Sequence, residues 1–424
     1  MYRLTHAQKA KVKDLLSRMT LEEKIGQMNQ ESVSIVGGFD VPFSELIEML
    51  TDGRITQEEF EKIMSTAEQD YHEDDIRAGR VGSLMVQEPE KCNELQKIAV
   101  EESRLVGQMA GSREEVIGAW AISWKEKDCV SIQEGLENAG TEYQYFPCCG
   151  PETDINEDEV AQACAYGDVI VAVVGELDSM SGEASSRADI TLPGRQRELL
   201  EKLLASGKPV VAVLMNGRPL ALKWEAEHVP ALLECWHLGV QMGNAVANIL
   251  LGIKAPEGKL ASSFPAVTGM CPIYYNHPNT GRPGGRSKFT SRYLDAGFEP
   301  LYPFGYGLSY TTFAYDNMEV TETADALHIM VDVSNTGDRA GVETVQLYMQ
   351  DVTAGIVRPV KELKGFAKAA LEPGEKKTVS LTLDKKDMGF YTDSGEYVLE
   401  DGKFRIYVGG NSRDCLTREV WLKF

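Results

Sequence analysis

Short apolar runs alternate with helix-like segments between residues 105 and 252, and this alternation limits the possible folds of the chain more than any other feature. The predicted strands are residues 143–146, 168–174, 209–215 and 230–236, and the predicted helices between them are residues 157–165, 195–205 and 241–251. Strands that are apolar on both faces are typical of a parallel sheet covered by helices. The pattern predicts right-handed βαβ units in a doubly wound α/β sandwich.

The segments on either side follow other patterns. The first 105 residues contain helical pieces, with starts predicted near Thr20 and Thr56, a short strand at residues 80–85 and a helix at residues 90–105. Residues 253–312 are rich in turn formers and predict a long ordered excursion over the sheet.

The C-terminal region predicts a small β-sandwich of the fibronectin type III kind. Its alternating segments are residues 327–333, 344–350, 376–383, 396–399 and 403–408, with turns between them. The expected domains are therefore a helical remnant at 1–105, an α/β sandwich at 106–312 and a β-sandwich at 313–424.

The net charge and the amino-acid composition argue against several classes of partner and ligand. A formal net charge of −22 argues against nucleic acid and anionic membranes as partners, since both would be repelled. The 8 cysteines match no zinc pattern, so we expect no metal and no cofactor. The polar N-terminal sequence and the lack of a long apolar run lead us to expect a cytoplasmic protein.

Candidate site residues lie in the polar loop after the run at residues 168–174, where open α/β sheets place their sites. They are Glu176, Asp178, Glu183, Arg187 and Asp189. The residues alone favour a solvated loop acid at Glu183, in a loop pinned by an Arg187–Asp189 pair. Glu176 at a strand end is also compatible with capping the next turn or pairing with a base such as Arg218.

Several long motifs resemble family 3 glycoside hydrolases of the β-glucosidase type. One reads Tyr302-Pro-Phe-Gly-Tyr-Gly-Leu-Ser-Tyr310, and the others are residues 16–28, 171–194, 209–219, 258–265, 274–283 and 292–301. Residues 333–337 and 342–348 resemble the fibronectin-type domain that closes many of these enzymes.

The resemblance implies hydrolysis of terminal β-D-glucosyl residues by a retaining mechanism with two carboxyl groups. Glu183 occupies the position that resembles the family's acid/base, with Glu176 as the weaker candidate. Asp178, Arg187 and Asp189 are then expected to contact a small-molecule or oligosaccharide β-glucoside. Glucose, xylose and N-acetylglucosamine remain open as the sugar, and the sequence does not determine the aglycone.

The departure from the family is large. Residues resembling the helix after the first barrel strand are followed, near residue 106, by residues resembling the first strand of the sandwich, so most of the TIM barrel is missing. The family's nucleophilic aspartate, in a Ser-Asp-Trp context, and its Lys-His pair have no counterpart, and the nucleophile is unknown. We therefore expect a weakly active or inactive isolated chain. The alternative is a non-catalytic interaction or carbohydrate-binding module, complemented by a partner or a second copy on the face that barrel loss exposes.

Overall fold

The computed structural model describes residues 30–32, 83–85, 103–119, 121, 124–285 and 287–424. Within the N-terminal region, β1 (Gln30–Ser32) and β2 (Ser83–Met85) form a parallel pair, which confirms the described part of the strand predicted at residues 80–85. The helices predicted near Thr20 and Thr56 lie outside the described residues.

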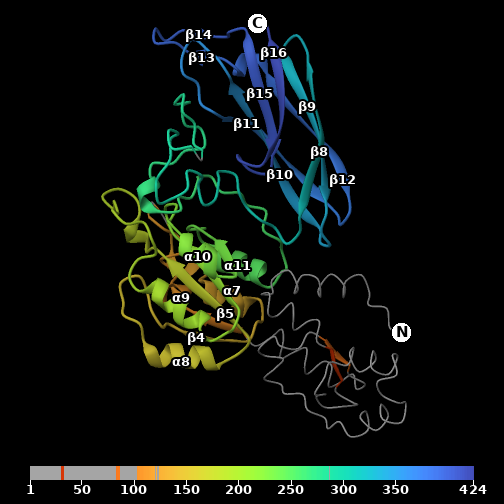
Figure 1. Cartoon of the computed structure of the whole chain (residues 1–424). Coiled ribbons are helices and arrows are strands. Elements are labelled where there is room, and N and C mark those ends of the chain that lie inside the picture. Colours follow the sequence, from red (N-terminus) through yellow and green to blue (C-terminus); the bar gives the residue numbers. More distant parts are fainter. Residues whose placement is uncertain (1–29, 33–82, 86–102, 120, 122–123, 286) are drawn as a thin grey trace, which may run out of the picture.

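A five-stranded parallel sheet organises the central part of the chain (Figure 1), and it confirms the predicted α/β architecture. Its strands run in the order β4-β3-β5-β6-β7, with bounds β3 (Ser103–Val106), β4 (Tyr143–Phe146), β5 (Val169–Gly175), β6 (Val210–Met215) and β7 (Ala231–Glu234). The chain therefore starts inside the sheet at β3, moves to the edge at β4, and crosses back to β5. Open α/β sheets bind ligands where the strand order reverses, here at the carboxyl ends of β3 and β5.

Helices cover both faces of this sheet. One face packs against α7 (Ile132–Asn138) and α11 (Met242–Leu250), and the other against α8 (Glu157–Ala165), α9 (Gln196–Leu204) and α10 (Lys223–His228). Strand β5 serves both layers, since Ala172 and Val174 join one core and Val171 and Val173 the other. Both faces are buried, and this is why the strand has no polar alternation.

Three short elements differ from the prediction. Residues 103–105, expected at the end of a helix spanning 90–105, belong to strand β3, and the boundary predicted at 105/106 falls inside this strand. The rest of that expected helix lies outside the described residues. Helices α7 and α10 were not predicted, because 7 and 6 residues are too few to display a helical period in the sequence.

The C-terminal part is an antiparallel β-sandwich, as predicted. One sheet has the order β11-β10-β15-β16 and the other β12-β9-β8, with bounds β8 (Phe313–Glu322), β9 (Ala326–Asn335), β10 (Gly341–Asp351), β11 (Glu362–Leu371), β12 (Lys376–Asp384), β15 (Gly402–Gly409) and β16 (Cys415–Leu422). A short hairpin of β13 (Phe390–Tyr391) and β14 (Tyr397–Val398) is added at one end. Four of these strands, β8, β11, β13 and β16, were not predicted. Of these, β8, β11 and β16 are edge strands of the two large sheets, where charged residues interrupt the apolar alternation.

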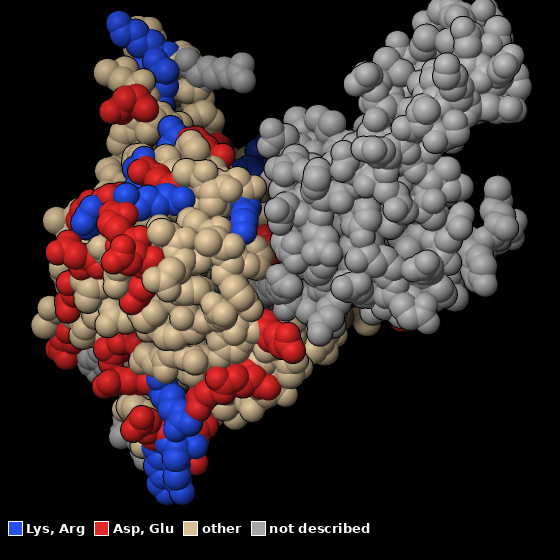
Figure 2. All heavy atoms as spheres, turned by 90° about the horizontal axis from the view of Figure 1, so that it is seen from below, with Lys and Arg blue, Asp and Glu red and all other residues tan. Residues whose placement is uncertain are grey.

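Residues 253–312 join the two domains with little regular structure, as expected from their turn formers. The Tyr310 hydroxyl donates to the Ile249 carbonyl at 2.6 Å, and the Lys259 ammonium lies 3.2 Å from the Glu343 carboxylate. The first contact attaches the linking segment to the end of α11, and the second attaches it to β10 of the β-sandwich. Figure 2 shows acidic and basic side chains intermixed around an uncharged central area of one face. The described helices include none that is long and apolar enough to cross a membrane.

Candidate active site

The loop after β5 begins from a rigid support. Gly175 has φ 144°, and a Cβ at this position would overlap the Met215 carbonyl oxygen of β6. The buried side-chain amide of Gln196 forms hydrogen bonds with both backbone polar groups of Gly175. It accepts from the Gly175 N–H at 2.8 Å and donates to the Gly175 carbonyl at 2.7 Å. Glu176 N–H then donates to Met215 at 2.7 Å. The first residues of the loop are therefore fixed relative to β6 and α9.

Glu176 is fully buried and is paired with two arginines. Its carboxylate lies 2.7 Å from Arg187 Nη1 and 3.0 Å from Arg218 Nε, and its exposed fraction is 0%. The pairing with Arg218 suggested by the sequence is thus present. A buried carboxylate requires such partners, because its charge would otherwise be strongly desolvated. This environment makes Glu176 the electrostatic anchor of the loop and keeps its carboxylate out of contact with solvent.

Arg218 also holds the loop further along. Its Nη2 donates to the carbonyls of Met180 and of Ser185, the latter at 2.7 Å. The Ser185 hydroxyl closes the same turn by donating to the Ser179 carbonyl at 2.9 Å. One guanidinium from the turn after β6 therefore connects the buried anchor to both ends of the turn that contains Glu183.

Glu183 stands at the tip of this turn. It is exposed, and its carboxylate makes no hydrogen bond or ion pair with the part of the chain that the structure describes. Its neighbours Gly182 (φ 99°) and Ala184 (φ 62°) both have positive φ values, and for Ala184 this conformation is strained. Strain of this kind persists only where surrounding contacts enforce it, and it is concentrated at functional sites.

The pair proposed between Arg187 and Asp189 is replaced by other contacts. Arg187 donates to Glu176 and to the Thr191 carbonyl at 3.0 Å. Asp189 accepts from the Thr191 N–H at 3.0 Å and from the Thr268 hydroxyl at 3.3 Å. The Thr191 hydrogen bond is the main cause that lowers the pKa of Asp189. The loop is pinned as expected, but through the buried Glu176 rather than through Asp189.

Asp178 leads to a residue that the sequence analysis missed. Its backbone N–H, at the start of the 3-10 turn Asp178–Met180, donates to Glu115 Oε2 at 2.7 Å. Burial raises the pKa of Glu115 to about 7, although the hydrogen bond from Asp178 opposes this shift. The only sequence signal was local: Ser112 precedes Glu115 by three residues, and its hydroxyl accepts the Glu115 N–H at 3.2 Å.

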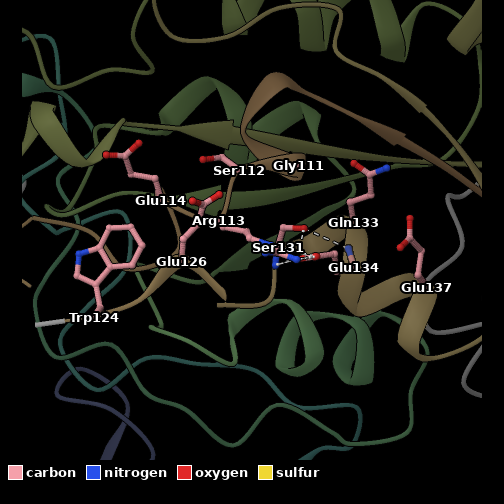
Figure 3. Close-up of a pocket in the computed structure, with 10 residues that line it drawn as sticks. All are labelled: Gly111, Ser112, Arg113, Glu114, Trp124, Glu126, Ser131, Gln133, Glu134 and Glu137. Atoms are coloured by element: carbon pink, nitrogen blue, oxygen red, sulfur yellow. Dashed lines mark hydrogen bonds and ion pairs between the residues drawn. The ribbon is translucent and has the colours of Figure 1, made fainter. Parts of the chain in front are cut away.

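Two cavities lie beside these strand ends. The smaller, of about 210 Å³, is at the carboxyl ends of β3, β4 and β5, with Gln108, Glu115, Thr153 and Leu177 among its walls. The larger, of about 710 Å³, has Trp124 on one side and Gln133, Glu134 and Glu137 of α7 on the other (Figure 3). In it, Arg113 forms an ion pair with Glu134, whose carboxylate also accepts the Ser131 N–H at 2.9 Å. Glu183 lines neither of these two cavities.

Two known domain families match this chain. Residues 94–310 match the model of the glycosyl hydrolase family 3 C-terminal domain, and residues 343–412 match the fibronectin type III-like domain. The chain belongs to glycosyl hydrolase family 3. It lacks most of the N-terminal barrel implied by the resemblance of its motifs.

Two curated relatives and one solved structure illustrate the match. The chain is 42% identical over 340 residues to a periplasmic β-glucosidase of Salmonella typhimurium, covering 73% of this chain and 44% of the relative. It is 39% identical over 295 residues to a β-xylosidase of Formosa agariphila, covering 67% of this chain and 40% of the relative. A β-glucosidase from Listeria innocua, solved with glucose, superposes with a TM-score of 0.70 and 33% identity, over 89% of this chain and 56% of that one. The chain thus spans less than half the length of these two curated relatives.

Proposed function

We propose that the chain provides the proton-donating half of a β-glucoside-hydrolysing site, with Glu183 as the general acid/base. The observation that carries the proposal is the contrast between the two loop carboxylates. Glu176 is buried and held by two arginines, whereas Glu183 is exposed on a strained, anchored turn with no partner in the described structure. A proton donor must reach the leaving oxygen of a bound sugar while its backbone stays in place.

The carboxylates available in this loop limit the hydrolysis that the isolated chain can perform. A retaining glycosidase needs a second carboxyl group roughly 5–5.5 Å from the first to attack the anomeric carbon. Among the loop acids, the carboxylate of Glu176 is enclosed by Arg187 and Arg218, and that of Asp189 is held by Thr191 and Thr268. We propose that the nucleophile, and most of the sugar site, have to come from a barrel that this chain does not contain. Cytoplasmic location remains a prediction, and the Salmonella relative is described as periplasmic.

A chimera tests the acid/base role directly. Residues 103–424 of this chain replace the matching C-terminal part of the Salmonella enzyme, which contributes its own barrel. We expect hydrolysis of phenyl β-glucoside, and Glu183→Gln should reduce this rate by roughly 10²- to 10⁴-fold. The loss should be much smaller with 2,4-dinitrophenyl β-glucoside, because dinitrophenolate leaves without being protonated.

The matched control is Glu227→Gln, which changes another exposed glutamate of the same domain. Its rates should equal those of the unmodified chimera on both substrates. A folded chimera without activity, or an active one in which Glu183→Gln leaves phenyl β-glucoside hydrolysis unchanged, would refute the assignment.

The second candidate function is a non-catalytic interaction module. It is favoured by exposed apolar side chains in the linking segment, where the exposed fractions of Phe289 and Leu294 are 74% and 92%. Large apolar side chains gathered in solvent are typical of protein contacts. Under this proposal the chain self-associates, and light scattering would give a mass above 46.8 kDa that Phe289→Ser and Leu294→Ser together reduce to the monomer. A monomer at all concentrations would remove this candidate.

A further inference from the structure

Glu115 lies at the carboxyl edge of the sheet and forms hydrogen bonds with segments that follow three different strands. It follows β3, and its N–H is held by the Ser112 hydroxyl at 3.2 Å. Its carbonyl accepts from Nδ1 of His237, which follows β7, at 2.8 Å. Its carboxylate accepts from the Asp178 N–H, after β5, at 2.7 Å. The backbone of Glu115 is therefore held by Ser112 and by His237. Its side chain in turn holds a third segment, the turn that begins at Asp178.

That third segment is the turn that leads to Glu183. Asp178 begins the 3-10 turn Asp178–Met180, and the carbonyl at the end of this turn is held by Arg218. The turn thus has one fixed acceptor, Glu115, for its first N–H and one fixed donor, Arg218, for its last carbonyl. Glu183, the proposed acid/base, lies only three residues after Met180. The position of the Asp178–Met180 turn therefore limits where Glu183 can lie.

The surroundings of Glu115 are acidic and half-buried. The charged groups that face it are Glu114 on its own segment, Asp178 after β5 and Glu152 after β4. From the β7 side, His237 contacts its carbonyl. Burial is the largest cause that raises the pKa of Glu115 to about 7, and the three carboxylates add to the rise. A loop opening that returns Glu115 to water removes both causes, together with the weaker opposing hydrogen bond from Asp178, so ionisation of Glu115 on balance favours the open loop.

We propose that Glu115 is a positioning residue for the loop that carries Glu183, holding the Asp178 turn closed while its carboxyl is neutral and releasing the turn when the carboxyl ionises. The proposal deepens the function proposed for Glu183 and rests on it for its significance. The hydrogen bond and its release need no turnover, so they are measured without any glycosidase activity.

Hydrogen–deuterium exchange of the full chain between pH 5.5 and 8.5 tests the proposal, with each rate divided by that of the unstructured peptide at the same pH. In the wild type, protection of the peptides covering residues 177–185 should fall about tenfold as pH rises through 7, because closing then requires a buried charge. Protection of strand β15 in the β-sandwich should stay constant over this range, which separates local opening from unfolding.

Two variants complete the test. Glu115→Gln keeps an acceptor for the Asp178 N–H but cannot ionise, so the loop should stay protected at every pH. Glu227→Gln, an exposed glutamate of α10 that is not among the charges facing Glu115, should reproduce the wild-type profile. A wild-type loop whose protection does not change with pH would overturn the proposal, as would a Glu115→Gln profile that follows the wild type. Should Glu115→Gln fail to fold, the wild-type and Glu227→Gln profiles still decide.

Discussion

Arg218 Nε lies 3.0 Å from the fully buried carboxylate of Glu176, and this pair joins the turn after β6 to the loop after β5. The same guanidinium binds the carbonyls of Met180 and Ser185. A single side chain thereby neutralises a buried charge and shapes the turn that presents Glu183.

Arg218→Ala should lower the free energy of unfolding by about 3 kcal/mol, because it leaves the buried Glu176 with only one of its two cations. Arg197→Ala, which breaks the exposed pair with Glu201 at 3.2 Å, should cost less than about 1 kcal/mol. Urea titration of both variants measures the difference. Equal losses would show that the Glu176 pair does not anchor the loop.

Gly175→Ala should destabilise the chain more than Gly207→Ala, although both glycines have positive φ values of 144° and 74°. At Gly207 the new methyl group meets open space, so only backbone strain of about 1 kcal/mol is expected. At Gly175 the methyl group would overlap the Met215 carbonyl, and β5 and β6 would have to separate. Thermal unfolding of the two variants compares them, and similar melting temperatures would contradict the close approach at Gly175.

Glu134 should stabilise the chain above its unfolded pKa and lose this effect in acid. Its hydrogen bonds from Arg113 are the largest cause that lowers the pKa from 4.5 to about 2. The stabilisation is present above pH 4.5 and disappears as pH falls through the window between these two values. Since the pair is partly exposed, we expect Glu134→Gln to cost about 1 kcal/mol at pH 7 and almost nothing at pH 2. A cost that is the same at both pH values would contradict the ion pair.

The contribution of Glu115 to the stability of the fold should depend on pH in the opposite sense to that of Glu134. Its pKa is about 7 in the fold against 4.5 unfolded, so the folded state binds more protons between these values and stability falls as pH rises through them. Glu115→Gln should therefore gain stability relative to the wild type, on the order of 2 kcal/mol, between pH 5 and pH 8. Denaturant unfolding at both pH values measures this gain. Parallel pH profiles for the two proteins would show that Glu115 titrates normally.

The sequence was sufficient for the elements that carry their own pattern. Strands β5 and β6 are apolar on both faces, and polar residues follow β5, so both the sheet and the polar loop after β5 were predictable. The pairing of Glu176 with Arg218 could be suggested because each residue directly follows, or nearly follows, a predicted strand end. Parallel strands bring such ends to one edge of the sheet.

The contacts of Glu115 could not be predicted in this way. Its carboxylate reaches Asp178, 63 residues away, and its carbonyl reaches His237, 122 residues away. Nothing local marks either contact, because each depends on the order of the strands. The edge strands β8, β11 and β16 were missed for a different reason, since one side of each is unpaired and tolerates the charges that hide the alternation.

The most direct test of the central claim is release of nitrophenol from a nitrophenyl β-glucoside by the purified chain, measured beside Glu183→Gln. If, as we propose, the chain contributes a proton donor without a nucleophile, neither protein should release nitrophenol above the rate in buffer. Release by the wild type that disappears in Glu183→Gln would contradict this account, since a second carboxylate of this chain would then attack the sugar.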